Sequence, residues 1–293
     1  MLIAKNLLGF ILIGIMSGTV YGLLAMGLSL QYGVCRVLNI SHGEFAMLAA
    51  VLTFTLSKLG INPLLAPVII GPLLFGLGFL FQTTLFRYVK ARAPSPAAFE
   101  GNALLVTFGL MYIISYIARL KFGTLLLRST YLINSVKSIG FVNLQLNLIL
   151  ACAIAVSLGI AVHIFLTRSR LGRAIRATGE DQATAELMGV NTNTILAVCF
   201  ALGALLAAVA GTLISIRTPV DTTIGFDNTI IALIVVTLGG LGSVPGSFIA
   251  GIIIGIVSML VTGFWVPVLA VPVYYAMLMV LLLARPSGIL GKK

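Results

Sequence analysis

Four polar residues interrupt a long apolar region near the N-terminus, in the stretch NISHGEFAM: Asn39, Ser41, His42 and Glu44. Ionisable residues inside a membrane are costly and usually face a bundle interior or a transport pathway. His42 and Glu44 are separated by about 200° around a helix, which disfavours a metal pair or a His–Glu acid–base dyad. A helix is expected to begin near Ile40–Ser41, with Glu44 about one turn inside it. Hydrogen bonding between helices, contact with a substrate and a proton relay remain open as roles.

A second stretch, TLGGLGSVPGSF, combines glycines with a proline inside another apolar region. Gly239, Gly240 and Gly242 would break a helix, and a broken helix at membrane depth is tolerated only inside protein or beside a water-filled cavity. Transporters use such helix ends as polar surfaces. We therefore place these glycines on a candidate translocation path. No Lys-Ser or Lys-Thr follows, so the stretch is not a phosphate-binding loop.

A third stretch, GEDQATAELMGVN, lies in the hydrophilic loop 167–194. Glu180 and Asp181 suit the start of a short helix, where free amides favour anions, and Gly189 suits its end. The apolar residues between them would fit a groove on a cytosolic partner, and a solvated turn is the alternative. The whole chain shows no nucleophile–base set, metal-ligand cluster or nucleotide-hydrolysis motif. We expect neither an enzyme nor a metal or cofactor site, so any ATP hydrolysis would belong to another subunit.

Composition places these stretches in a membrane. Of the 293 residues, 60% are hydrophobic and 9% are charged, whereas soluble domains carry roughly 25% charged residues. Backbone groups in lipid must bond internally, and continuous apolar runs favour helices over a barrel. The fold class is therefore an all-α integral membrane protein with one domain over residues 1–293. The net charge of +11 is attributed to basic residues facing an anionic leaflet rather than to nucleic-acid binding.

About eight spans are expected, because a crossing needs about 20 apolar residues. The region 229–262 is interpreted as a half-helix that enters, turns around Gly239–Gly246 and leaves as a longer helix. Four arginines between Arg168 and Arg176 place that loop in the cytosol, with the C-terminus inside and the N-terminus outside. Asp221 and Asp227 are expected in a solvated outer connection. The other spans are Leu7–Leu30, Val37–Leu56, Leu64–Phe86, Ala103–Ile117, Leu146–Leu166, Thr194–Ser215 and Val266–Ala284.

Small residues at every fourth position indicate close helix packing. They form two faces, one with Gly14, Gly18 and Gly22 and the other with Gly203, Ala207 and Gly211.

Four segments in order along residues 21–291 carry a resemblance to a known family. They are YGLLAMGLSLQYGVCRVLNISHGEFAML, RLGRAIRATGEDQATAELMGVNTNTILAVCFALGALLAAVAGTL, LIVVTLGGLGSVPGSFIAG and RPSGILG. The chain resembles permease subunits of branched-chain amino acid ABC transporters, of the LivH type. That family usually shows Asn, an apolar residue, a small residue, His, Gly and Glu, as residues 39–44 do here. The outer segment FGTLLLRSTYLINSVKSIG matches poorly.

The resemblance implies one half of an importer in the bacterial inner membrane. Its partners would be a second related permease, two cytosolic ATPases that bind ATP and Mg²⁺, and a periplasmic or surface-tethered binding protein. Leucine, isoleucine and valine are the implied substrates, although related systems carry other neutral amino acids, urea or short amides. An ion-coupled secondary transporter using Glu44, and a passive channel, are the rivals. The family's coupling region against the ATPase corresponds to Glu180, Asp181, Ala185, Glu186, Leu187, Met188 and Gly189.

Overall fold

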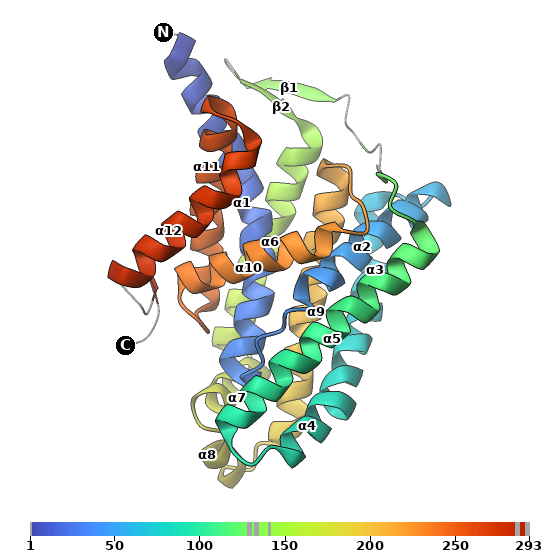
Figure 1. The fold of residues 1–293 in the computed structure, drawn as a ribbon, viewed down its shortest axis with the longest axis vertical. Helices are drawn as coiled ribbons and strands as arrows, with labels where there is room; N and C mark the ends of the chain where they lie inside the picture. Colours follow the sequence, from blue (N-terminus) through green and yellow to red (C-terminus); the bar gives the residue numbers. More distant parts are fainter. Residues whose placement is uncertain (1, 128–130, 132–134, 140–141, 285–287, 291–293) are drawn as a thin grey trace.

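The computed structural model describes residues 2–127, 131, 135–139, 142–284 and 288–290. These residues form a helical bundle with one small antiparallel hairpin, β1 (Val136–Ile139) and β2 (Val142–Gln145), at one end (Figure 1). A π-helical turn at Gln82–Phe86 joins α3 and α4 into one rod. The helices are α1 (Leu2–Cys35), α2 (His42–Lys58), α3 (Ala66–Phe81), α4 (Arg87–Arg92), α5 (Pro96–Phe122), α6 (Leu146–Arg168), α7 (Arg170–Glu180), α8 (Gln182–Leu187), α9 (Thr192–Arg217), α10 (Ile224–Gly239), α11 (Val244–Phe264) and α12 (Ala270–Ala284).

Within the described residues, six helical segments are long and apolar enough to cross a membrane: α1, the α3–α4 rod, α5, α6, α9 and α11. The helices α10 and α12 are apolar but shorter. The chain is therefore a multi-pass membrane protein, as composition predicts. The spans predicted at Leu7–Leu30 and Val37–Leu56 are wrong at their facing ends, because α1 continues to Cys35 and residues 36–41 are not helical. The helix start predicted near Ile40–Ser41 is confirmed, since Ser41 is the N-cap of α2 and Glu44 lies in its first turn.

The predicted half-helix is confirmed. Helix α10 has 16 residues, and α11, with 21, follows it after a four-residue turn. The turn needs Gly240 and Gly242, whose φ angles of 102° and 84° lie in the region that side chains disfavour. Ser243 then caps α11 by accepting a hydrogen bond from the Gly246 amide at 3.2 Å.

Both predicted small faces lie at close helix contacts. A Cβ atom on Gly18 would lie 2.6 Å from the Gly251 carbonyl oxygen of α11. A Cβ atom on Gly203 of α9 would lie 2.6 Å from the Gln31 side chain of α1, and one on Gly211 would overlap the Ala46 backbone of α2. Helices α1, α2, α9 and α11 therefore pack backbone to backbone, which creates a rigid frame.

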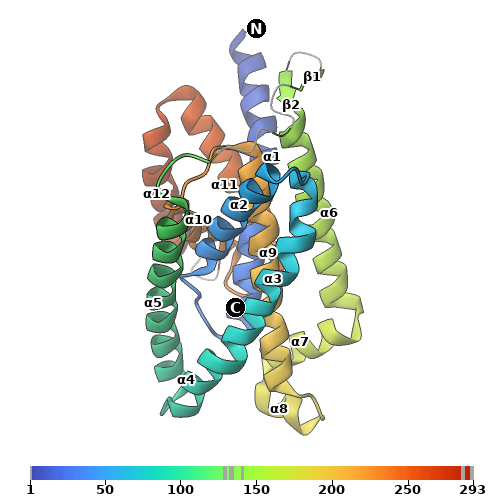
Figure 2. The same cartoon turned by 90° about the vertical axis from the view of Figure 1, so that its right-hand side faces the viewer.

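The two ends of the bundle differ in charge. The N-terminus and the hairpin lie at one end, and α4, α7 and α8 lie at the other (Figures 1 and 2). We call the latter the basic end, because it carries Arg87, Lys90, Arg92, Arg168, Arg170, Arg173 and Arg176. The arginine-rich segment was expected to be a loop, but it forms α7, which Ser169 caps by accepting from the Gly172 amide at 2.8 Å. Positive charge predicts that the basic end is cytosolic. The C-terminus was also predicted to lie inside, and its basic residues Arg285, Lys292 and Lys293 lie outside the described residues.

Candidate translocation and coupling sites

The segment between α1 and α2 folds back into the bundle. Its turn begins at Arg36, a non-glycine residue with a φ of 55°. Asn39 organises the residues that lead into α2, because its Oδ1 accepts hydrogen bonds from the Ser41 amide at 3.1 Å and the Ser41 hydroxyl at 2.6 Å. Its Nδ2 donates to Gln31 Oε1 of α1 at 3.1 Å. Asn39 and Ser41 are fully buried, so these bonds fix where α2 begins.

Two threonines from neighbouring helices satisfy the irregular backbone. The Ile40 amide donates to Thr107 Oγ1 of α5 at 3.2 Å. The Gly43 amide donates to Thr229 Oγ1 of α10 at 2.9 Å, and the same hydroxyl donates to the Ile40 carbonyl at 2.9 Å. Buried backbone groups need such partners. The break before α2 is therefore held by α1, α5 and α10 together.

His42 and Glu44 face different neighbours, as their spacing predicts. The fully buried His42 donates from Nε2 to the Leu24 carbonyl of α1 at 3.0 Å. Glu44 is 2% exposed, and its carboxyl group lies against Gly225 of α10, where a Cβ atom would overlap it. Neither Glu44 Oε2 nor His42 Nδ1 has a hydrogen-bond partner among the described residues, but only Glu44 lines a cavity. His42 therefore serves the α1–α2 contact, and Glu44 stays available.

Glu44 lines a cavity of about 480 Å³ between α2, α5 and α10. Arg119 and Asp227 bring one positive and one further negative charge to the same cavity. Its remaining lining is mostly aromatic or apolar: Phe108, Met111, Tyr112, Ser115, Tyr116, Thr223 and Phe226. Apolar walls with a few convergent polar groups are typical of small-molecule sites. This arrangement can pair with both charges of a zwitterion while the walls hold an apolar side chain.

Helix α8 at the basic end has the predicted caps. Asp181 Oδ1 accepts from the Ala183 amide at 2.9 Å and the Thr184 amide at 3.3 Å, and Oδ2 accepts from the Thr184 hydroxyl at 2.5 Å. The Thr184 hydroxyl, followed by these amides, lowers the pKa of Asp181 below its usual range. Gly189 ends the segment with a φ of 83°. Glu180 was expected at the start of this helix, but it is the last residue of α7.

The surface of α8 offers an apolar pair to a partner. Leu187 is 87% exposed and Met188 is 81% exposed, whereas Ala185 is buried against the bundle. Glu186 accepts a hydrogen bond from the Thr192 hydroxyl at the start of α9. Two adjacent large apolar side chains in water are unfavourable unless something covers them.

Comparison with known sequences identifies the family. The family described as "Branched-chain amino acid transport system / permease component" matches residues 10–283. The chain belongs to this permease family. The permease is 29% identical to the high-affinity branched-chain amino acid transport system permease protein LivH of Salmonella typhimurium, over 95% of this chain and 94% of LivH. It is 30% identical to BraD of Pseudomonas aeruginosa, a permease protein of the same description, with the same coverage.

A solved structure supports the fold alone. PsaBC from Streptococcus pneumoniae, in complex with Fab, superposes with a TM-score of 0.52 and covers 97% of both chains. Its sequence identity to this permease is 14%, so the likeness concerns the arrangement of helices.

The structure separates the residues predicted for the translocation path into two groups. Asn39, Ser41 and His42 hold the start of α2, and Glu44 alone among the four polar residues lines the cavity. The glycines of the turn lie at the opposite end of α10, roughly 24 Å away for a 16-residue helix. There the Leu290 amide donates to the Gly239 carbonyl at 3.1 Å. A role of these glycines in translocation stays a prediction.

Sequence reasoning missed two charged residues of the cavity and a glycine packed against Glu44. Arg119 lies two residues beyond the predicted span Ala103–Ile117, and nothing in its spacing connects it with Glu44. Asp227 was expected in a solvated connection, but it lies in the first turn of α10. Gly225, which makes room for the Glu44 carboxylate, is a single glycine without a motif. Gly225 of α10 packs against Gly43 of α2, and this pairing becomes visible only in three dimensions.

Proposed function

We propose that this permease is the membrane-spanning subunit of an ABC importer for neutral amino acids with apolar side chains. It would work in a bacterial inner membrane beside a second permease subunit, two cytosolic ATPases and an extracytoplasmic binding protein. The observation that carries the substrate class is the cavity at Glu44, which combines charges of both signs with apolar walls. Membership of the permease family supports the transport role.

The substrate would pass through this cavity with its charges compensated. Glu44 pairs with the ammonium group, Arg119 pairs with the carboxylate, and the aromatic walls contact the side chain. A buried carboxylate without a partner is unfavourable until a cation arrives. Because the binding protein would supply selectivity, the path needs only brief contacts, and weak binding favours release.

Coupling to ATP would occur through α8. Leu187 and Met188 would insert into a groove on an ATPase, and Ala185 would transmit the movement to the bundle. Gln182 links this helix inward: it accepts from Lys90 Nζ of α4 at 2.6 Å and donates to the Val34 carbonyl of α1 at 3.4 Å. The bundle would then alternate its access by reorienting about the turn at Gly239–Gly246.

The substrate assignment is tested by a substitution that removes the charge of a residue lining the cavity. The transporter is purified with its associated subunits, reconstituted in vesicles and assayed for uptake of leucine and of urea. Arg119→Gln is expected to lower leucine uptake roughly 10- to 100-fold, because it removes a charge-assisted hydrogen bond. Lys121→Gln is the matched control: Lys121 lies on the same helix, over the Phe122 ring and outside the cavity lining. Equal leucine uptake in both variants would refute the assignment, and ATP-driven uptake of urea alone would favour the amide alternative.

The same vesicles separate the importer from its rivals. Glu44→Gln is compared with Glu100→Gln, which alters an exposed residue of α5. An importer requires ATPase subunits for accumulation, whatever the ion gradient. The isolated chain would be a secondary transporter if it accumulated leucine on an ion gradient and if the pH dependence of this uptake changed in Glu44→Gln. Equilibration without accumulation in the complete assembly would establish a channel.

A further inference from the structure

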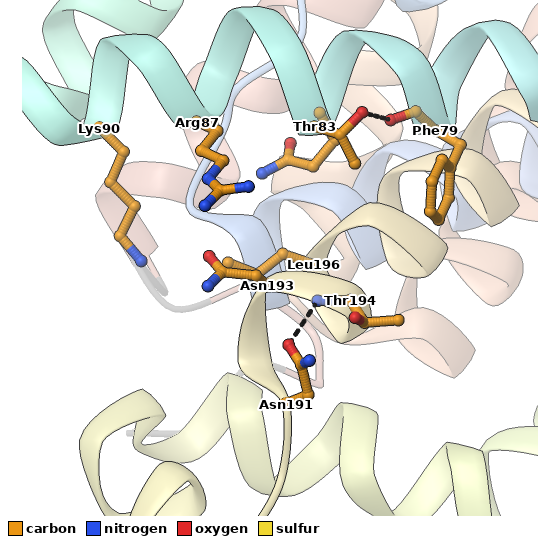
Figure 3. A pocket seen from close by; sticks show the side chains of 9 residues that line it. Phe79, Thr83, Arg87, Lys90, Asn191, Asn193, Thr194 and Leu196 are labelled. Atoms are coloured by element: carbon orange, nitrogen blue, oxygen red, sulfur yellow. Dashed lines mark hydrogen bonds between the residues drawn. The ribbon is translucent and has the colours of Figure 1, made fainter.

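A second cavity lies at the basic end, between the α3–α4 rod and the start of α9 (Figure 3). Its volume is about 270 Å³. Arg87 and Lys90 contribute two positive charges, and none of the described residues that line it is acidic. The other lining residues are Phe79, Gln82, Thr83, Asn191, Asn193, Thr194 and Leu196. The charge of this cavity therefore fits an anion.

The cavity forms because α3 and α9 separate toward the basic end. Higher in the bundle they are in close contact, since a Cβ atom on Gly78 would lie 2.9 Å from the Ala204 Cβ. The π turn at Gln82–Phe86 then interrupts the regular helix. Such turns occur frequently at functional sites, because the extra residue re-aims the side chains around it. Here the turn contributes Gln82 and Thr83 to the cavity.

Gln82 supplies an independent sign of a missing ligand. Its side chain is 5% exposed, it lines the cavity, and its Oε1 has no hydrogen-bond partner among the described residues. Buried polar atoms are almost always paired, so an unpaired amide beside a cavity indicates a polar occupant. Oε1 can only accept, so an anion is bound when the amide is flipped and presents its Nε2 hydrogens to the cavity.

The start of α9 contributes a further preference for negative charge. Asn191 caps this helix by accepting from the Thr194 amide at 3.2 Å (Figure 3). The N-terminus of a 26-residue helix favours an anion through its dipole and free amides. Figure 3 shows Arg87 extending from α4 toward Asn193, so cation and helix end face each other across the cavity.

We propose that this cavity binds a phosphate group, supplied by the headgroup of an anionic phospholipid in the leaflet at the basic end. Phe79 and Leu80 are 36% and 52% exposed on the apolar side of the rod. Arg87 lies eight residues beyond Phe79, a rise of roughly 12 Å, so the cavity extends from the acyl-chain level toward the headgroup level. Basic pockets between membrane helices on the cytosolic side bind anionic headgroups.

The site is connected to α8, because Lys90 also donates to Gln182, the first residue of that helix. A bound phosphate would hold Lys90 between α4 and α8. Glu186 accepts a hydrogen bond from the Thr192 hydroxyl at the start of α9, but it does not line the cavity. Lipid binding at this position is independent of which substrate the permease carries.

The test compares lipids that differ only in headgroup. The full-length chain is purified in detergent, and native mass spectrometry measures binding of phosphatidylglycerol, phosphatidylcholine with the same acyl chains, and inorganic phosphate. Both lipids carry a phosphate, but the choline cation of phosphatidylcholine would be repelled by Arg87 and Lys90. Phosphatidylglycerol is therefore expected to bind about tenfold more tightly, a difference of roughly one charge–charge contact. Arg87→Gln should abolish this preference. Arg92→Gln should preserve it, because Arg92 lies on the same helix but stacks on Tyr88 at 3.6 Å from the ring centroid, outside the cavity.

The outcomes separate the sources of the phosphate group. A headgroup preference that depends on Arg87 supports the lipid. Binding of inorganic phosphate alone, also dependent on Arg87, supports the anion site and assigns it a soluble occupant. Equal binding of both lipids without a phosphate response would overturn the proposal. The proposal would also be overturned if Arg87→Gln and Arg92→Gln lowered the preference for phosphatidylglycerol equally. A preference that stayed unchanged in both Arg87→Gln and Gln82→Leu would overturn it as well.

Discussion

The contact between Gly43 of α2 and Gly225 of α10 can be tested from both sides. A Cβ atom on Gly43 would overlap the Gly225 carbonyl oxygen and the amide and hydroxyl of Thr229. Two of these atoms belong to the α10 backbone and cannot rotate away. For a Cβ atom on Gly225, the three nearest atoms instead all belong to the Glu44 carboxyl group, the end of a flexible side chain. Alanine at Gly43 and alanine at Gly225 are therefore expected to lower the free energy of unfolding by different amounts.

For Gly43→Ala, overpacking costs about 1–3 kcal/mol. Separation of the helices would also weaken the hydrogen bond from the Gly43 amide to Thr229, worth about 1 kcal/mol. The higher helix propensity of alanine returns up to about 1 kcal/mol, so the net loss is about 2 kcal/mol. For Gly225→Ala, displacing Glu44 from its rotamer costs about 0.5–1.5 kcal/mol. Alanine propensity offsets most of this, so the net change in unfolding free energy is near zero.

The assay is thermal unfolding of full-length variants in one detergent, read as the fraction that remains monodisperse after heating. For a chain of 293 residues, a loss of about 2 kcal/mol corresponds to a midpoint lower by roughly 3 °C. Gly109→Ala is the control, since no atom lies within 4 Å of a Cβ there. If Gly43→Ala unfolds at the same temperature as Gly109→Ala, or if Gly225→Ala loses as much as Gly43→Ala, the packing argument fails.

Three further predictions concern the frame and α8. Gly18→Ala should lower the unfolding midpoint by several degrees, because its Cβ would lie 2.6 Å from an α11 carbonyl oxygen. Gly76→Ala, with open space around it, should leave the midpoint unchanged, and equal midpoints for the two variants would contradict this. Glu186→Arg should release the ATPase or uncouple hydrolysis from uptake while insertion stays normal, and normal copurification together with normal uptake would count against docking at α8. Because hydrogen bonds lower the pKa of Asp181, its cap is complete above the ordinary value of 3.8 and is lost as the pH falls below it. Asp181→Ala should therefore raise amide exchange across Gln182–Leu187 at neutral pH more than Asp181→Asn does, and unchanged exchange would show that the cap is dispensable.

Local signals explain which elements could be predicted from the sequence. The turn between α10 and α11 and the caps of α8 depend on glycine and aspartate at fixed positions, so the chain itself encodes them. The break at 36–41 contains no glycine or proline. It is maintained by Thr107 and Thr229, which are far away in sequence. Helix α7 was missed because its arginines suggested a loop, although Ser169 supplied a usable cap.

The cavity could not be predicted, because its charged residues come from three helices. Glu44, Arg119 and Asp227 belong to α2, α5 and α10, and no periodicity within one helix relates them. Even the notable stretch at residues 39–44 divides in the structure. Most of its polar side chains satisfy backbone groups, and Glu44 is left to face the cavity. A cluster in sequence therefore does not indicate a cluster in function.

Helix α10 lines the cavity at Glu44 and is connected through α1 to α7, the helix that precedes α8. At one end, Gly225 lies against Glu44. At the other, the turn after α10 meets α1, where a Cβ atom on Gly33 would lie 2.9 Å from the Gly242 Cα. A Cβ atom on Gly179 of α7 would in turn lie 3.2 Å from the Gly33 carbonyl oxygen.

The contacts of Gly33 with Gly242 and with Gly179 join backbones without intervening flexible side chains, so a displacement of α7 cannot be absorbed there by rotamer changes alone. Under the proposed function, a push on α8 would reach Glu44 through α7, α1 and α10. Spatial continuity alone does not establish coupling. The Glu186→Arg and Gly225→Ala variants act at the two ends of this route, and additive effects on ATP-driven uptake would show that its ends are independent.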